Sequence, residues 1–182
     1  MGKALGMVEF VTVSAGMNGA DTMIKTADVD VVECATVCPG KYMVIINGEL
    51  SAVKAAVDAA KVQNPEKVID SFVLGNPHES IFPAIYGATP PEDVEALGVM
   101  ETFSAASAIV AADAAAKTSL VNLLELRLAR GMCGKSYLLL TGSVSAVKAA
   151  IERANLEAGD RGMFLDSSVI PRPDAKLWAS IL

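Results

Sequence analysis

The feature that most constrains this chain is an internal repeat. Residues 5–9 (LGMVE) recur as residues 97–101 (LGVME), and the pair Asp21 and Lys25 recurs as Asp113 and Lys117, all at an offset of 92 residues. Repeats in unchanged order over most of each half indicate a duplicated structural unit. Further matches follow at offsets of 94 and then 96 residues: Gly40-Lys41 with Gly134-Lys135, 51–56 with 145–150, and 70–77 with 166–173.

The repeat predicts two modules joined by a linker. We place the first module at residues 1–86, the linker at 87–96, and the second module at 97–182. Each module is about the size of the smallest independent domains, which bury little surface and often need a partner. The growing offset predicts two small insertions in the second copy.

Strand and helix patterns alternate within each copy. In the first copy, strands are expected at residues 4–11, 29–37, 41–47 and 67–74, and helices at 16–27 and from Ser51 onward. Ser51 is expected to cap its helix, and Pro77 to open a short final helix. The pattern predicts an α/β fold, an α+β sandwich in which each module is a small sheet packed with helices.

The composition favours assembly over membrane insertion. The chain is 52% hydrophobic and 20% charged, with a mean hydropathy of +0.42. Its longest apolar stretch, residues 103–116, is too short to span a bilayer and contains Asp113. The beginning of the chain lacks the apolar core of a signal peptide. We therefore expect subunits that bury surface against one another, with no membrane partner.

Charge and cysteine content narrow the function further. The net charge is −6 and the isoelectric point about 4.8, with no basic run, which argues against nucleic acid as a partner. Three cysteines without an export signal make a disulfide framework improbable and indicate a reducing cytoplasm. Two similar modules in one chain allow three chains to form a ring that mimics six modules.

The motifs together resemble the bacterial microcompartment shell domain. They are Leu-Gly-x-x-Glu at each module start, Asp-x-x-x-Lys on the first helix, Gly-Lys before a strand, and the final Val-Ile-Pro-Arg-Pro. The resemblance covers nearly the whole chain. It implies a structural protein rather than an enzyme: a homotrimeric, pseudohexameric tile that packs edge to edge with other shell proteins around enclosed enzymes. It also implies a pore lined by Cys38, Pro39 and Gly40 and by Gly131, Met132, Cys133 and Gly134.

Cys38-Pro39-Gly40-Lys41 resembles the tandem shell protein of the propanediol-utilisation type that holds an iron–sulfur cluster in its pore. The resemblance implies that three symmetry-related copies of Cys38 bind one [4Fe–4S] cluster per trimer, which commonly has four thiolate ligands. It further implies electron transfer across the shell, with a redox enzyme as partner, or delivery of the cluster to an enzyme inside. Cys133 aligns with Pro39 and is a weaker candidate for the same metal site.

The other candidate residues have structural interpretations beside functional ones. Cys34 is expected to be a small core residue, and Glu9 and Glu101 to be structural. His78 is expected near a helix start rather than as a catalytic base. The family resemblance places Lys25, Lys117 and Arg172 at the tile edge, although both lysines could simply pair with the aspartates one turn away.

Two alternatives to the cluster-bearing tile stay open at this point. One is a shell tile without a cluster, whose pore conducts a metabolite. The other is a trimeric regulator that binds a small molecule between subunits and forms no sheets.

Overall fold

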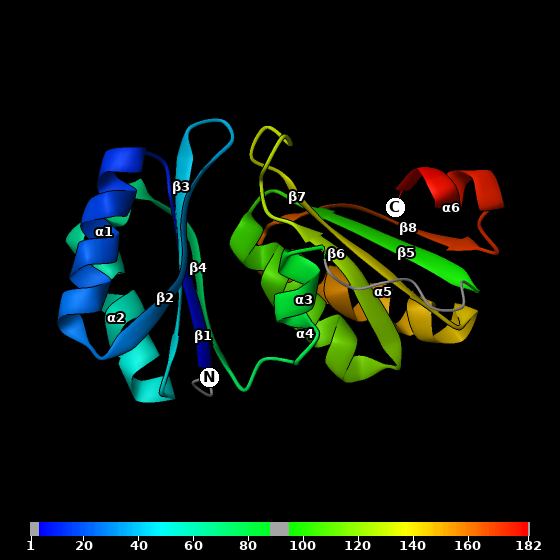
Figure 1. The fold of residues 1–182 in the computed structure, drawn as a ribbon, viewed down its shortest axis with the longest axis horizontal. Helices are drawn as coiled ribbons and strands as arrows, with labels where there is room; N and C mark the ends of the chain where they lie inside the picture. Colours follow the sequence, from blue (N-terminus) through cyan, green and yellow to red (C-terminus); the bar gives the residue numbers. More distant parts are fainter. Residues whose placement is uncertain (1–3, 88–94, 182) are drawn as a thin grey trace. The chain divides into compact units, whose positions relative to one another are not determined.

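Two four-stranded antiparallel sheets, one from each copy, form the framework of the computed structural model, which describes residues 4–87 and 95–181 (Figure 1). The strand orders, β2-β3-β1-β4 and β6-β7-β5-β8, are the same in both copies, as expected for a duplication. The first sheet contains β1 (Ala4–Phe10), β2 (Val29–Val37), β3 (Lys41–Gly48) and β4 (Val68–Gly75); the second contains β5 (Ala96–Thr102), β6 (Val121–Arg127), β7 (Ser136–Gly142) and β8 (Phe164–Pro171).

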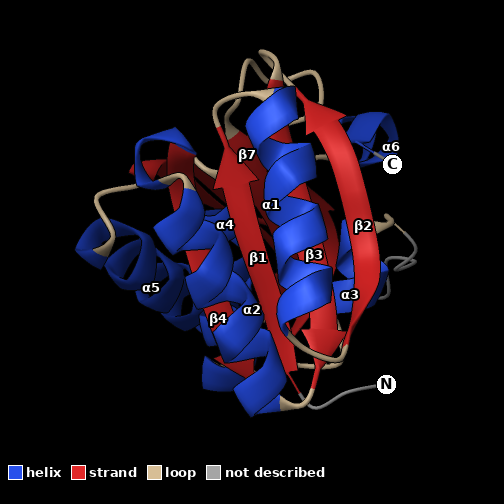
Figure 2. Cartoon of the chain, turned by 90° about the vertical axis from the view of Figure 1, so that its left-hand side faces the viewer, coloured by secondary structure: helices blue, strands red, loops and turns tan. Residues whose placement is uncertain are grey.

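Helices cover one face of each sheet. In the first copy α1 (Val13–Thr26) and α2 (Leu50–Gln63) lie side by side in front of the sheet (Figure 2), and the short helix η1 (Pro65–Lys67) precedes β4. In the second copy α5 (Val144–Asp160) packs on β5 and β8. The remaining helices are α3 (Ile81–Ile85), α4 (Ala105–Thr118) and α6 (Ala175–Ile181). The predicted α/β architecture is confirmed.

The first core forms between the sheet and its two helices. Phe10, Val44 and Ile46 from the strands meet Met23 from α1 and Val53 from α2, and all five side chains are fully buried. Burial of side chains of this size is worth about 1.5–3 kcal/mol each. The helices approach the strands closely because small residues face them: a Cβ added to Gly16 would lie 2.4 Å from Tyr42 Cβ.

Contacts divide the chain into two compact units whose limits differ from those of the repeats. The first unit holds residues 1–77 with two segments from the second copy, Ser104–Ser107 and Leu128–Lys135. The second holds His78–Phe103, Ala108–Arg127 and Ser136–Leu182. Most of the predicted linker lies outside the described residues. Among the described helices, none is long and apolar enough to cross a bilayer.

Three predicted helix starts are wrong. Helix α1 begins at Val13 rather than residue 16, because Thr12 Oγ1 accepts a hydrogen bond from Ala15 N at 3.4 Å and caps it early. Helix α2 begins at Leu50, directly after the short turn that follows β3, so Ser51 lies inside it and caps nothing. Helix α3 begins at Ile81, well after Pro77.

The two insertions in the second copy have clear positions. One enlarges the connection between β6 and β7, which spans residues 128–135 where the first copy needs only residues 38–40. The other lengthens the helix before the last strand, from 14 residues in α2 to 17 in α5.

Candidate metal-binding loop

Cys38 lies at the tip of the hairpin between β2 and β3. The turn consists of residues 38–40, and Gly40 N donates to Val37 O at 2.9 Å. Gly40 has φ +109°, a conformation that glycine adopts without the steric cost of a side chain. The Cys38–Pro39 peptide bond is cis. The predicted hairpin is therefore confirmed, and it presents a half-buried thiol at a turn.

The enlarged loop of the second copy lies against this turn. Cys38 N donates to Ala129 O at 3.2 Å, so the two loops predicted to line a pore are brought together within the first unit. The loop reverses direction through four residues with positive φ: Ala129, Gly131, Cys133 and Gly134. Cys133, which directly follows Met132 in this turn, has an exposed side chain.

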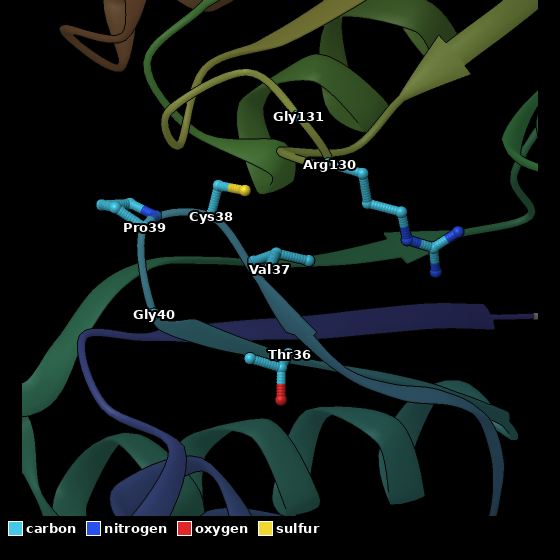
Figure 3. A pocket seen from close by; sticks show the side chains of 7 residues that line it. All are labelled: Thr36, Val37, Cys38, Pro39, Gly40, Arg130 and Gly131. Carbon is cyan, nitrogen blue, oxygen red and sulfur yellow. The ribbon is translucent and has the colours of Figure 1, made fainter.

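A pocket of about 360 Å³ opens beside Cys38 (Figure 3). The side chain of Arg130 extends along one wall, and its guanidinium forms an ion pair with Glu33 of β2. The walls are otherwise largely apolar or backbone. The residues that line the pocket are Thr36, Val37, Cys38, Pro39, Gly40, Arg130 and Gly131.

A buried ion pair supports the base of the two loops. Lys41 Nζ donates to Glu9 Oε1 at 3.0 Å and to Gly134 O at 3.2 Å. The other oxygen of Glu9 accepts from Ala105 N at 3.0 Å. Burial raises the pKa of the Glu9 carboxyl, and the charge of Lys41 partly opposes that rise. The structural role expected for Glu9 holds. The partnership with Lys41 was missed, although Gly-Lys recurs in both copies.

A second carboxylate, that of Asp70, accepts hydrogen bonds from the start of α4. Asp70 Oδ2 accepts from Ser104 Oγ at 2.5 Å and from Ser107 Oγ at 2.7 Å, and both serines are fully buried. Glu9 and Asp70, on the neighbouring strands β1 and β4, thus hold the first turn of one helix. This network was not found from the sequence, because nothing in a serine or aspartate reveals a partner about 35 residues away.

Cys34 corrects one prediction. Its side chain is exposed, not part of the core. It lies on β2, an edge strand whose burial is irregular along its length, so strand parity did not determine which side chains are covered. Although the side chain is exposed overall, desolvation of the thiol by partial burial raises its pKa. A raised pKa disfavours the thiolate, which is the form that binds metal. Among the described residues, no group of three or more His, Cys, Asp or Glu side chains is placed to hold a metal ion within one chain.

The predicted helix ion pairs form in both copies. Lys25 Nζ lies 2.7 Å from Asp21 Oδ2, and Lys117 Nζ lies 2.7 Å from Asp113 Oδ2. Both pairs span one helical turn, and the lysines remain accessible. The other predicted edge residue, Arg172, follows β8 with φ +50°.

His78 lies just before α3, as expected. Its Nδ1 is 2.8 Å from Ser80 Oγ, and its backbone N donates to Asp113 Oδ1 at 2.7 Å. These contacts hold the beginning of a short helix. The imidazole ring of His78 is therefore engaged by Ser80, next to the start of α3.

The structure thus contains two similar modules of one topology, each with a loop between its second and third strands at one end of the sheet. The chain matches the BMC domain family twice, over residues 4–77 and 96–173, and it belongs to that family. It is thus a structural shell protein of bacterial microcompartments and not an enzyme, and family membership places it in the shell of these cytoplasmic bodies.

Individual relatives narrow the class to the tandem type. The chain is 37% identical over 182 residues to the bacterial microcompartment shell protein PduT of Citrobacter freundii, with 100% of this chain and 99% of that protein covered. It is 44% identical to a microcompartment protein of Desulfitobacterium hafniense of known crystal structure, with a TM-score of 0.85 over 98% of this chain and 99% of that one. The shell protein PduA of Citrobacter freundii is 38% identical over 81 residues, 43% of this chain and 87% of its own length.

Proposed function

We propose that three copies of this chain form a pseudohexameric shell tile that holds one [4Fe–4S] cluster on its three-fold axis. The observation that carries the proposal is the position of Cys38 at a hairpin tip, beside the loop of the second copy. A single chain offers no metal site of its own among the described residues, so a cluster at Cys38 requires several chains. A three-fold axis supplies three thiolates to one point.

The repeat supports the trimer. Glu9 and Asp70 of the first copy hold the start of α4, which belongs to the second copy. Their counterparts are Glu101 and Asp166, and the counterpart of the α4 start is the α1 start at residues 12–15. The counterparts of Ser104 and Ala105 are Thr12 and Val13, which keep a hydroxyl and a backbone N–H, whereas Ala15 lacks the hydroxyl of Ser107. Most of this contact can therefore form between the second copy of one chain and the first copy of the next. Such a head-to-tail contact closes into a ring when its rotation permits.

The difference in burial between the copies supports a second copy of the chain as the partner. Met17 of α1 is largely exposed, whereas its counterpart Ile109 of α4 is fully buried. Val11, just before α1, is also exposed, as is its counterpart Phe103, so the difference between the copies rests on Met17. Large apolar side chains gathered at one end of a helix indicate an interaction surface.

The residues around Cys38 fit a cluster shared at an axis. The thiol is half-buried, and the backbone N–H of Cys38 is already engaged by Ala129 O, which fixes the turn. The cluster would supply one-electron transfer, because iron–sulfur clusters change oxidation state with little rearrangement. Three Cys38 ligands leave one iron without a thiolate from this residue. Cys133, exposed on the adjacent loop, is a further candidate ligand.

The function of such a tile is electron transfer across the shell to a redox enzyme, or delivery of the cluster to an enzyme inside. The alternative is a cluster-free tile whose pore conducts a metabolite. The open pocket beside Cys38 favours this second candidate if the loops bind no metal. A small-molecule regulator loses its support because the chain belongs to the shell family.

Iron and acid-labile sulfide content, with EPR after reduction, tests the cluster on protein purified without oxygen. Light scattering after gel filtration establishes the trimer in the same samples. We expect about four irons per trimer in the wild type, lost in Cys38→Ser and retained in the matched control Cys34→Ser. If the wild type and Cys38→Ser both form iron-free trimers, even after reconstitution, the cluster is ruled out and the metabolite-conducting pore remains as the function. Cys133→Ser reports whether that thiol contributes.

The tile edge is proposed at Lys25, Lys117 and Arg172. Both lysines remain accessible beside their aspartates, so each amine is available to a neighbouring tile. Electron microscopy of purified protein tests this: Lys25→Ala with Lys117→Ala should abolish ordered sheets while the trimer persists. Lys61→Ala, on the exposed end of α2, is the matched control. If the double variant still assembles into the same two-dimensional arrays of tiles, the contact between tiles does not involve these lysines.

A further inference from the structure

The two short helices that end the modules are repeats of one another. Ile81, Phe82 and Ile85 of α3 correspond to Leu177, Trp178 and Ile181 of α6 at the offset of 96 residues seen for the preceding strands. Both helices thus carry the same pattern of three large apolar side chains. Helices with equivalent sequences in equivalent modules are expected to occupy equivalent places.

Helix α3 packs on the edge strand β6. Ile81 and Ala84 are fully buried there, and His78 N donates to Asp113 Oδ1 of α4, which ties down the beginning of the helix. Leu123 of β6 is also fully buried. Its partner across the ladder is Leu140, on the face of the sheet covered by α5. Helix α3 therefore belongs to the helix-covered face of its sheet.

Helix α6 lies on the opposite face. Trp178 and Ile181 pack against Leu97, Leu124 and Leu139. Leu97 adjoins Gly98, which faces α5, and successive residues of a strand point to opposite faces. Figure 1 accordingly shows α6 on the side of the second sheet away from α5. None of the described residues of α6 is fully buried there, in contrast to those of α3.

The place on the first copy that corresponds to the α3 site is uncovered. Val31 of β2 is 44% exposed where its counterpart Leu123 is 0% exposed, and Ile24 of α1 is 49% exposed where its counterpart Ala116 is 9% exposed. Val31 pairs with Ile46, a residue of the core under the helices, so it lies on the helix-covered face as Leu123 does. Asp21, the counterpart of Asp113, is also exposed.

We propose that α6 is exchanged between chains: in the assembled ring it leaves Leu97, Leu124 and Leu139 and packs on the α1–β2 surface of the adjacent chain. This inference rests on the proposed trimer. Leu177, Trp178 and Ile181 cover Val31 and Ile24 of that chain, and Asp174 N donates to its Asp21, as His78 N does to Asp113. The occupant is thus a second copy of this chain, identified by the repeat.

The exchange also explains why α6 covers its present site in an isolated chain. In the first copy, the start of α4 lies against β1 and β4 through Glu9 and Asp70. The equivalent contact for the second copy brings the start of α1 of the next chain to β5 and β8. Helix α6 lies against Leu97 of β5 and Ile170 of β8, so it shields apolar surface on these two strands before assembly.

Photo-crosslinking of the full chain tests the exchange. p-Benzoylphenylalanine replaces Trp178, the only tryptophan, and in a second variant Leu177, which is exposed in the isolated chain. The matched control is the same substitution at Phe82, the equivalent position of α3. Light scattering establishes whether each variant is trimeric before irradiation. Denaturing gels and mass spectrometry then identify the linked chains.

The exchange predicts that the links at positions 177 and 178 convert the 18.9 kDa band to one of about twice that mass, with the new link on residues of α1 or β2. The link at position 82 stays within one chain. A trimer whose α6 links stay within one chain, on Leu97, Leu124 or Leu139, would overturn the exchange and leave the trimer intact. A chain that is monomeric in light scattering would overturn the trimer and the exchange with it.

Discussion

Lys41 Nζ lies 3.0 Å from Glu9 Oε1, and this ion pair joins the first strand of the chain to the residue that ends the Cys38 turn. Glu9 is fully buried and Lys41 nearly so. The same ammonium donates to Gly134 O, so one side chain connects β1, the first-copy loop and the second-copy loop. The pair is therefore a structural support for the candidate metal-binding loop.

Replacing Lys41 with Met should strongly destabilise the protein. The substitution leaves the Glu9 carboxylate buried without a counter-charge, which typically costs about 3–5 kcal/mol. Lys25→Met is the matched control, because its ion pair with Asp21 is exposed and is worth about 0–1 kcal/mol. Urea unfolding at one protein concentration measures both. Equal losses in the two variants would contradict the role given to the buried pair.

The raised pKa of Glu9 predicts a pH dependence of stability. A carboxyl whose pKa in the folded protein exceeds its ordinary value of 4.5 stabilises the fold most below that value. The contribution is lost as the pH rises through the folded pKa. Thermal unfolding of wild type and Glu9→Gln between about pH 4 and 7 should therefore show the wild type losing stability relative to the variant as the pH rises. A constant or opposite difference would contradict the raised pKa.

The close approach of α1 to β3 predicts a steric cost at Gly16. An added Cβ would lie 2.4 Å from both Cβ and Cδ1 of Tyr42, so Gly16→Ala forces the helix and the strand apart. Overpacking of this kind costs about 1–3 kcal/mol. Gly159→Ala in α5 is the matched control, because no atom lies within 4 Å of its added Cβ. There the higher helix propensity of alanine should make the change neutral or stabilising by up to about 1 kcal/mol.

Tyr137 should titrate late. Burial first, then its hydrogen bond to Glu125, raises the pKa of the phenol to about 12. The stability that the protonated phenol contributes is thus present below its ordinary value of 10 and lost as the pH rises through about 12. NMR titration of the tyrosine ring carbons measures this pKa. Glu125→Gln removes the carboxylate and should lower it, and an unchanged value would contradict the contribution of Glu125.

Much of the fold was predictable because it depends on local patterns. The repeat established two equivalent modules, and the alternation of apolar residues located the four strands and two main helices of the first copy. Helix starts were less predictable. Ser51 and Pro77 carry the expected residue types, but the length of the preceding turn determines where each helix begins.

The candidate site was predictable in part. Cys38-Pro39-Gly40 occurs between two strand patterns, so a thiol at a hairpin turn followed from the sequence. Cys34 shows the limit of that reasoning, because its exposure depends on what covers an edge strand. The partnerships of Lys41 with Glu9 and of Asp70 with Ser104 and Ser107 join residues distant in the chain, and no local pattern encodes them.

The sequence by itself determined the duplication, the alternation of strands and helices within each copy, and the family. The tertiary structure alone decided how the copies differ. Equivalent residues, such as Val31 and Leu123, are exposed to different extents. The equivalent helices α3 and α6 lie on opposite faces of the second sheet. The physical reason is that burial depends on every neighbour a residue acquires on folding, whereas a repeat in the sequence specifies only the local structure of each copy.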